Sequence, residues 1–408
     1  MAVNKRKILN DPVHGFITIP DELIFGLMNH PCFQRLTRIR QLGLTYLVYP
    51  GALHTRFNHA IGAMHLMDEA TEILKQKGFE ITPEEKQAAL AAILLHDVGH
   101  GPFSHALENS LIHNVSHEDI SLKLMEKLNQ ELGGQLTLAI KIFKGTYKKK
   151  FLHQLVSGQL DVDRLDYLSR DSFFTGVSEG VIGTERILKM MTISNDELAV
   201  EEKGIYSVER FIIARRLMYW QVYFHKTVVA AEQMLIAALK RAHDLALNGE
   251  KIYAPPALAF FLEKNNNKTN LNATTLENFV DIDDSDILSC LKVWQYHNDA
   301  VLSRLAANLL NRKLARVIIE SKPISKKNRD DLLKKISKTY NISAEDASYF
   351  LSYGEIENNA YAPGIDKIWI AYKDGTRKDI TEASDQLSYG TISKTVVKYF
   401  LCCPKEIL

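Results

Sequence analysis

Apolar residues recur at helical spacing from about residue 22 to residue 244, and this pattern predicts a predominantly helical body. A strand pair separated by a turn is expected before it, over 7–12 and 15–20. Inside the helical stretch we expect one hairpin, with strands over 197–200 and 205–208 on either side of 202–204.

The C-terminal third has a different pattern. A charged helix is expected over 326–339, and two strands are expected over 367–372 and 377–380 around Lys373-Asp374-Gly375. The predicted fold class is therefore mainly α, with an all-helical core, short β-hairpins and a small α+β C-terminal part. The expected segments are a core over 1–247, a helical extension over 248–320 and the α+β part over 321–408.

Composition narrows the class of protein. The 408 residues are 46% hydrophobic and 24% charged, which is typical of a globular chain. The net charge of +1 gives no reason to expect a nucleic-acid partner. The longest apolar run, Ala88 to Leu95, is far shorter than the roughly 20 residues of a spanning helix, so no membrane partner is expected. Four cysteines without a C-x-x-C spacing, and a basic start without an apolar segment after it, predict a cytoplasmic protein.

Histidines are concentrated in one part of the chain. Eight of the 14 lie between His54 and His117. A helix with a capping-box start at Thr82 is apolar on every side from residue 88 to residue 95 and then ends in His96-Asp97. A buried carboxylate needs a partner for its charge, and beside an imidazole a metal ion is the natural one.

Two further segments extend this set. A helix over 56–77 begins near His59, and Gly62 and Ala63 on the same face would let it approach the 83–95 helix closely. Farther along the chain, one helical face carries four polar residues at i, i+3, i+4 and i+7, namely Asp163, Asp166, Tyr167 and Arg170. Taken alone, this stripe is more typical of a solvent-facing surface.

Two imidazoles and two carboxylates form a mixed nitrogen and oxygen ligand set, which suits Fe, Mn, Zn or Ni better than Mg. Four protein ligands leave positions for water and a phosphate oxygen, as a catalytic metal requires. The other histidines, considered singly, are interpreted as surface or satisfied core residues: His14, His30, His54, His65, His113, His153, His243 and His297.

The motifs, in their order along the chain, resemble those of the HD-domain metal-dependent phosphohydrolases, and most closely the branch of deoxynucleoside triphosphate triphosphohydrolases. The matching stretches cover about residues 8 to 245 and are Asn10 to Gly15, Phe33 to Leu36, Arg40 to Gly43, Pro50 to His59, His96 to His105, Ser116 to Glu118, Asp161 to Tyr167 with Arg170-Asp171, and Tyr223 to Lys226.

The resemblance implies a role for each matching residue. The implied metal ligands are His59, His96, Asp97 and Asp163. His105 would act at the α-phosphate as general acid or as orienter of the attacking oxygen. His100 and His117 would bind phosphate or support the acid, and Glu118 would hold a histidine in position. The implied substrate contacts are Arg56 and Arg164 with the triphosphate, Gln41 and Asp171 with the sugar 3′-hydroxyl, Tyr167 beneath the sugar, and His225 near the base or phosphates.

The implied reaction is hydrolysis of a dNTP to a deoxynucleoside and inorganic triphosphate. The implied cofactor is one divalent transition metal (Fe, Mn, Zn or Ni), with room for an additional Mg²⁺ ion that arrives with the triphosphate. A homo-oligomer, dimer or tetramer, is expected as well.

Departures from the family pattern bear on regulation and on base preference. Asn29 and Thr37 replace an acidic residue and an arginine of the guanine-nucleotide activator site, so activation by another nucleotide stays open. Gln221 stands where a relative has arginine in the substrate pocket. Two other functions also stay open: an HD nucleotidase or phosphodiesterase acting on monophosphate or cyclic esters, and a non-catalytic nucleotide sensor.

Overall fold

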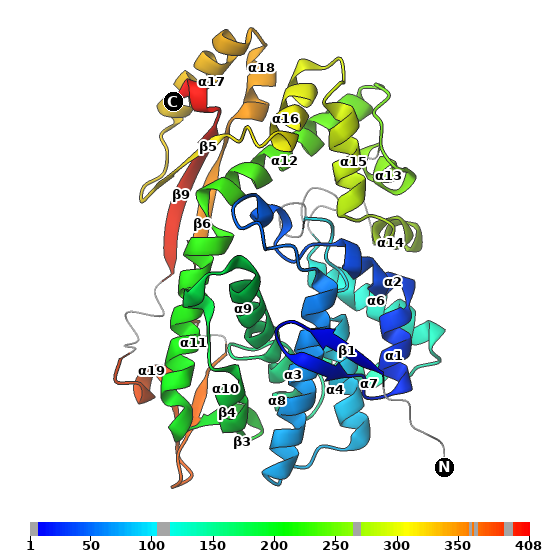
Figure 1. Cartoon of the computed structure of the whole chain (residues 1–408), viewed down its shortest axis with the longest axis vertical. Coiled ribbons are helices and arrows are strands. Elements are labelled where there is room, and N and C mark those ends of the chain that lie inside the picture. The colour runs from blue at the N-terminus through cyan, green and yellow to red at the C-terminus, as the bar shows by residue number, and fades with distance from the viewer. Residues whose placement is uncertain (1–6, 104–114, 264–270, 359–360, 363–365, 387–394) are drawn as a thin grey trace.

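Helices make up most of the structure, a computed structural model that describes residues 7–103, 115–263, 271–358, 361–362, 366–386 and 395–408 (Figure 1). The fold is mainly α, as the sequence predicts. The helices up to the candidate site are α1 (Glu22–Asn29), α2 (Pro31–Gln34), α3 (Arg56–Gln76), α4 (Pro83–Leu95), α6 (His117–Glu131), α7 (Thr137–Phe143), α8 (Lys150–Val156) and α9 (Val162–Thr175). Those that follow are α10 (Thr184–Met190), α11 (Ile205–Met218), α12 (Lys226–Leu247), α13 (Pro256–Leu262), α14 (Ala273–Val280), α15 (Asp284–Trp294), α16 (Ala300–Leu310), α17 (Lys326–Tyr340), α18 (Ala344–Ala347) and α19 (Ile380–Ala383).

Helix α3 packs against both α4 and α9, and this three-helix arrangement positions the candidate site. The start of α4 is fixed by a capping box between Thr82 and Glu85, with Pro83 at the first helical position, as predicted. The body of α4 is buried on all sides from Ala88 to Leu95. The N-terminal end of α3, the C-terminal end of α4 and the first turn of α9 therefore meet inside the core.

The strands of the described residues form three small sheets. A hairpin pairs β1 (Ile8–Asp11) with β2 (Gly15–Thr18), as predicted. The second sheet has the order β3-β4-β7-β8, and the third has the order β5-β9-β6. Their bounds are β3 (Met191–Ser194), β4 (Glu197–Glu201), β5 (Arg316–Glu320), β6 (Ser352–Asn358), β7 (Trp369–Ala371), β8 (Arg377–Asp379) and β9 (Val396–Cys403).

Strand pairing joins all three predicted segments. Strand β4 of the first segment pairs in parallel with β7 of the last, and β5 of the middle segment pairs with β9 of the last. The boundaries at residues 247 and 320 remain predictions. The β5-β9-β6 sheet packs against α12 through β5, and Asn358 at the end of β6 donates to the carbonyl oxygen of Arg216 near the end of α11.

The hairpin expected over 197–208 is wrong in its pairing. Strand β4 pairs with β3, which precedes it, and residues 205–208 begin α11 instead of forming a strand. The turn lies at Asn195 and Asp196, whose φ angles are +53° and +61°. Two adjacent residues with positive φ are the signature of the tight hairpin turn that Asn and Asp favour.

All four cysteines are buried free thiols. Among the described residues, no helix combines the length and the apolar character needed to cross a membrane.

Candidate metal centre and substrate site

Four of the predicted residues meet where α3, α4 and α9 converge. Nε2 of His59 lies 3.1 Å from Oδ1 of Asp163, and Nε2 of His96 lies 3.5 Å from the same oxygen. Asp97 lies on the other side, with Oδ1 3.3 Å from Nε2 of His96 and Oδ2 3.8 Å from Nε2 of His59. Both histidines and Asp97 are buried.

The second ring nitrogen of each histidine is fixed by a hydrogen bond. Nδ1 of His59 donates to Asp166 at 2.8 Å, and Nδ1 of His96 donates to the carbonyl oxygen of Ile93 at 2.6 Å. These bonds leave Nε2 of each ring as the free lone pair. Neither Nε2 atom has a hydrogen-bond partner among the described residues, although both are buried.

The donor atoms of this arrangement fit a divalent metal ion. Two buried imidazole nitrogens that have no hydrogen-bond partner in the described part of the chain face carboxylate oxygens, and the donor atoms of His59, His96 and Asp163 lie within 4.8 Å of one another. Nitrogen and carboxylate donors together suit a divalent transition metal. The residues therefore fit the metal that the sequence implies, and His59, His96, Asp97 and Asp163 would hold it.

The electrostatics of the cluster also favour a cation. Burial alone would lower the pKa of His59, but the nearby carboxylates of Asp163 and Asp166, the second of which accepts its Nδ1–H, outweigh this effect and raise the pKa to about 10. Burial would raise the pKa of Asp97, but the neighbouring His96, His100 and Arg56 hold it well below its usual range. The carboxylates are thus ionised and create a negative potential at the point where the two Nε2 atoms meet.

The polar stripe on α9 faces inward, which rules out the solvent-facing alternative. Asp166 and Arg170 are fully buried. Gly62 makes room for them: a Cβ at this position would lie 2.0 Å from Oδ1 of Asp166 and 2.2 Å from a terminal nitrogen of Arg170. The small residue on α3 therefore serves the contact with α9, whereas the sequence assigned it to the contact with α4.

The structure also places the predicted supporting residues beside the cluster. Nε2 of His100 lies 3.3 Å from Oδ1 of Asp97, and the ring of His100 stacks on that of His117 at 3.8 Å between centroids. Glu118 lies 3.4 Å from His117 and is largely exposed. His105, the predicted acid, lies outside the described residues.

The predicted phosphate-binding arginines both pair with aspartates at the site. Arg56 donates to Asp97, and Arg164 donates to Asp161, the N-cap residue of α9. Nε of Arg164 is buried without a hydrogen-bond partner among the described residues. Both cations are thus held at the edge of the cluster.

The residues predicted to contact the sugar are Gln41, Asp171 and Tyr167. Oε1 of Gln41 is buried and has no hydrogen-bond partner among the described residues, so it is available to a ligand hydroxyl. Asp171 accepts hydrogen bonds from His54 at 2.8 Å and from Tyr223 at 2.7 Å. The ring of Tyr167 stands edge-on to that of Tyr223, at 6.4 Å.

His225 is predicted to lie near the base or phosphates, and this role stays a prediction. It caps α12, accepts a hydrogen bond from the backbone of Thr227 and contacts the ring of Tyr49. It lines a cavity of about 690 Å³ with Trp220, Phe224 and other residues.

Sequence reasoning missed two groups at the site. His14, interpreted as a surface or satisfied core residue, donates to Asp166 at 2.6 Å. Tyr219 and Tyr223 belong to a π-helical turn that follows α11, and π-helical turns are frequent at functional sites. Burial raises the pKa of Tyr167, and the nearby Arg215, in the last turn of α11, partly opposes this rise. The motif Asn10 to Gly15 carried the signal for His14, but no spacing rule links it to Asp166.

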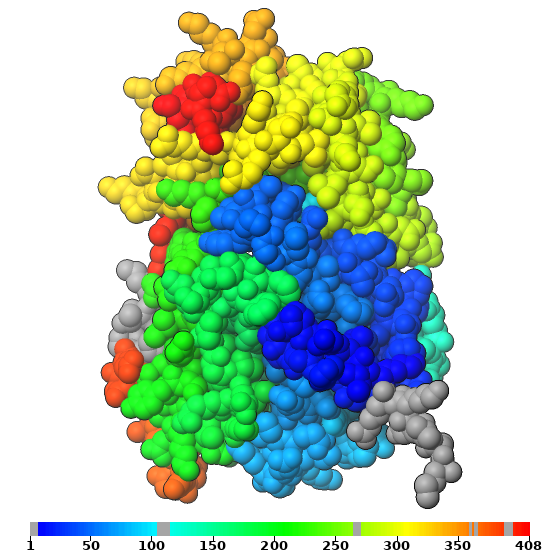
Figure 2. Space-filling view, viewed as in Figure 1, coloured from blue at the N-terminus to red at the C-terminus, as the bar shows by residue number. Residues whose placement is uncertain are grey.

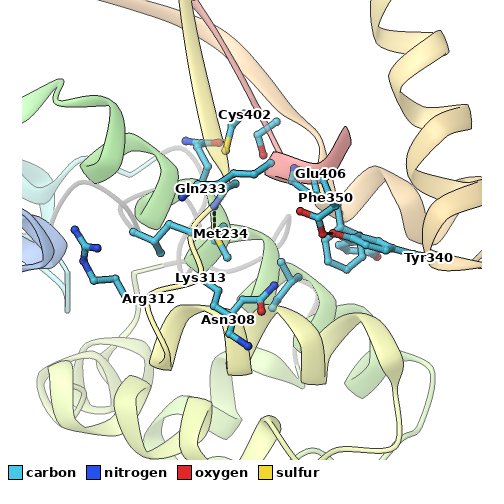
Figure 3. Close-up of a pocket in the computed structure, with 16 residues that line it drawn as sticks. Gln233, Met234, Asn308, Arg312, Lys313, Tyr340, Phe350, Cys402 and Glu406 are labelled. Carbon is cyan, nitrogen blue, oxygen red and sulfur yellow. Dashed lines mark hydrogen bonds between the residues drawn. The ribbon is translucent and has the colours of Figure 1, made fainter. Parts of the chain in front are cut away.

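A separate cavity of about 390 Å³ lies between α12, α16 and the β5-β9-β6 sheet. Figure 3 shows Met234, Tyr340 and Cys402 around it. Its lining contains none of the residues predicted for the catalytic site.

Comparisons with known proteins find related sequences and structures along most of the chain. Residues 56–171 match the HD domain family, and residues 182–255 match the HD associated region. The crystal structure of a phosphohydrolase from Bacteroides thetaiotaomicron is 55% identical, has a TM-score of 0.94, and covers 98% of this chain and 100% of its own. The uncharacterized protein YwfO of Bacillus subtilis is 35% identical over 94% of this chain and 88% of its own length.

A relative with a stated activity is more distant. The deoxynucleoside triphosphate triphosphohydrolase SAMHD1 homolog of Dictyostelium discoideum is 31% identical over 61% of this chain and 52% of its own length. The chain thus spans about half of that relative.

The helical fold and the His-Asp centre define a phosphohydrolase of the class that binds a divalent metal. The chain belongs to the HD-domain phosphohydrolase family, near the branch of the dNTP triphosphohydrolases.

Proposed function

We propose that this phosphohydrolase cleaves dNTPs to a deoxynucleoside and inorganic triphosphate. One observation carries the proposal: the Nε2 atoms of His59 and His96, which have no hydrogen-bond partner among the described residues, face Asp163 and Asp97, and Arg56 pairs with Asp97. A second cation, Arg164, follows Asp163 on α9 and pairs with Asp161. A triphosphate needs several cationic contacts, whereas a monoester needs fewer.

The metal ligands and the two arginines would have different roles in the reaction. A divalent metal ion bound by His59, His96, Asp97 and Asp163 would supply Lewis-acid polarisation of a phosphoryl oxygen and activation of water. Arg56 and Arg164 would pair with phosphate oxygens in place of their present aspartate partners.

The reaction breaks the bond between the α-phosphorus and the 5′-oxygen. The oxygen of water becomes part of the triphosphate, and a proton goes to the 5′-oxygen of the leaving deoxynucleoside. In this proposal His105 donates that proton or orients the attacking oxygen, and His100 and His117 with Glu118 support it. On the sugar side, the unpaired Oε1 of Gln41 accepts from the 3′-hydroxyl.

The test is product analysis. Protein loaded with Mn²⁺ is incubated with a panel of dNTPs and NTPs, and the products are separated by chromatography. Triphosphate and nucleoside are expected. Diphosphate products, or turnover of monophosphate or cyclic esters alone, would point to another HD hydrolase, and binding without turnover would point to a nucleotide sensor.

The metal assignment has its own prediction. Asp97→Ala should abolish activity and lower the metal content, because it removes one donor and its charge. Asp97→Asn retains the side-chain shape and should lower metal content as well. Asp281→Ala, at an exposed aspartate, is the control and should leave both unchanged. Elemental analysis that finds full occupancy in both Asp97 variants would contradict the assignment.

The proposal extends to assembly and regulation. We expect a dimer or tetramer, to be measured by light scattering, and an activator nucleotide, to be sought by adding each NTP and dNTP to a slowly hydrolysed substrate. Equal rates with and without every added nucleotide would contradict activation.

A further inference from the structure

The N-terminal hairpin contributes to a buried polar network. Figure 2 shows this dark-blue segment on the visible face of the molecule, and β2 packs against α3. Oδ1 of Asp11 accepts hydrogen bonds from the backbone N–H groups of Val13 and His14, both at 2.9 Å. These two bonds fix the turn between β1 and β2 and thereby the position of His14.

The hairpin reaches the candidate metal centre through Asp166. Nε2 of His14 donates to Oδ1 of Asp166 at 2.6 Å, and Nδ1 of His59 donates to Oδ2 of Asp166 at 2.8 Å. A continuous chain of hydrogen bonds therefore leads from the hairpin to the imidazole whose other nitrogen faces Asp163.

Arg170 completes the network. Its Nε and one terminal nitrogen each donate to a different oxygen of Asp166 at 2.9 Å, and its terminal nitrogens also bind Asp11 at 2.7 and 3.2 Å. Asp166 thus accepts four hydrogen bonds, two on each oxygen. A carboxylate offers about four lone-pair sites, so this one is fully satisfied and has a single orientation.

The two metal-facing histidines differ in this respect. His96 is oriented by a backbone carbonyl of its own helix, whereas His59 is oriented by a carboxylate that the hairpin holds. A carboxylate behind a metal-binding histidine fixes the ring and raises the basicity of the other nitrogen, and removing it typically lowers metal affinity about 10- to 100-fold.

We propose that Asp166 and His14 are positioning residues: they orient His59 and thereby set the affinity of the site for its metal. The β1-β2 hairpin is then part of the metal centre. The inference rests on the proposed metal site and adds a residue from a segment outside the residues matched to the HD domain, 56–171.

The test measures the dissociation constant of Mn²⁺ for the full chain and four variants. His14→Ala should weaken Mn²⁺ binding about 10-fold, and Asp166→Asn about 10- to 100-fold. His14→Gln should bind within about 3-fold of the unmodified protein, because its amide nitrogen can occupy the place of Nε2 and donate to Asp166.

His65→Ala is the matched control. This ring lies 5.5 Å from that of His14 and pairs with Glu69, but it has no hydrogen bond to Asp166. It should leave Mn²⁺ binding unchanged, which separates the hydrogen-bond chain from the packing of the hairpin. Turnover at saturating Mn²⁺ should be largely restored in His14→Ala, because the defect lies in affinity.

Either of two results would overturn the inference. One is unchanged Mn²⁺ affinity in both His14→Ala and Asp166→Asn, even if their thermal midpoints fall, because that would make the network merely structural. Another is an equal loss of affinity in His65→Ala. Neither result bears on dNTP hydrolysis by the unmodified protein, and a protein that hydrolyses no dNTP can still show the predicted shifts in Mn²⁺ affinity.

Discussion

Tyr167 lies one helical turn beyond Asp163 on α9, and its ring stands edge-on to Tyr223, the donor to Asp171. In the proposed function, the aromatic pair and Asp171 line the space in which the sugar of a bound nucleotide lies. A ring packed beneath the sugar offers no hydrogen-bond partner to a 2′-hydroxyl. Burying that hydroxyl without a partner costs roughly 1–3 kcal/mol.

We predict that dNTPs are preferred over NTPs by about 5- to 150-fold and that Tyr167→Ala narrows this ratio by admitting ribonucleotides. Tyr167→Phe keeps the ring and should keep the ratio. The measurement is kcat/KM for matched dNTP and NTP pairs. If Tyr167→Ala lowers stability and all activities together while the ratio stays constant, the ring only packs.

At the scale of secondary-structure elements, the close contact between α3 and α9 depends on a missing side chain. The space that a Cβ at Gly62 would need is filled by Asp166 and Arg170, both of which are buried and hydrogen-bonded. Neither can move without breaking the network around His59.

Gly62→Ala should therefore destabilise the protein by at least about 2 kcal/mol, although alanine is the better helix former, and should weaken Mn²⁺ binding. Gly26→Ala in α1 is the control, because its Cβ would meet nothing within 4 Å. This control should stabilise the protein by about 0.5–1 kcal/mol. Denaturant unfolding measures both changes, and equal stabilisation by the two substitutions would contradict the packing argument.

Glu232 of helix α12 makes the stability of the protein depend on pH. Burial raises the pKa of Glu232 from its ordinary 4.5 to about 7. The folded chain therefore keeps a proton between pH 4.5 and pH 7 that the unfolded chain releases, so stability falls as the pH rises through this range. At higher pH the cost is constant, at about 3 kcal/mol.

Glu232→Gln should remove this dependence. We expect its thermal midpoint to exceed that of the unmodified protein by about 3 °C at pH 8 and to match it at pH 4.5. Scanning calorimetry at the two pH values is the measurement. An equal difference at both pH values would show that the carboxyl does not titrate in this range.

Across the whole molecule, one arginine connects distant parts of the chain to the site. Arg35 is fully buried and donates to the carbonyl oxygens of Val98, His100 and Ile282, at 3.0, 2.5 and 3.1 Å. Asp284, which follows Ile282 closely, accepts from the backbone N–H groups of Arg40 and Phe103. The segment around 282–284 thus supports the loop that follows the His-Asp pair.

Arg35→Leu should destabilise the protein by roughly 3–5 kcal/mol, because three buried carbonyl groups lose their donor. Arg38→Leu is the matched control: its side chain is half exposed and pairs with Asp283, so about 1 kcal/mol or less is expected. Thermal unfolding compares the two. A small effect of Arg35→Leu would show that the middle segment does not support the site.

The sequence determined the elements that local rules control. The capping box at Thr82, the helices that begin at Arg56 and Lys326, and the β1-β2 hairpin all follow from periodicity and turn residues, which act over a few positions. The concentration of histidines and the His-Asp pair also indicated a metal, because buried charge needs a partner wherever the chain folds. The same rules predict the wrong partner for β4, because the tight turn lies at Asn195-Asp196 and not at 202–204.

Tertiary structure alone decided which residues support the ligands. Gly62 and His14 have no sequence pattern that ties them to Asp166, which is 152 residues from His14. The polar stripe on α9 could equally have faced solvent, and only the packing of α9 against α3 turned it inward. Periodicity gives the face of a helix but not the partner that covers it, since the partner is chosen by shape and charge across the whole fold.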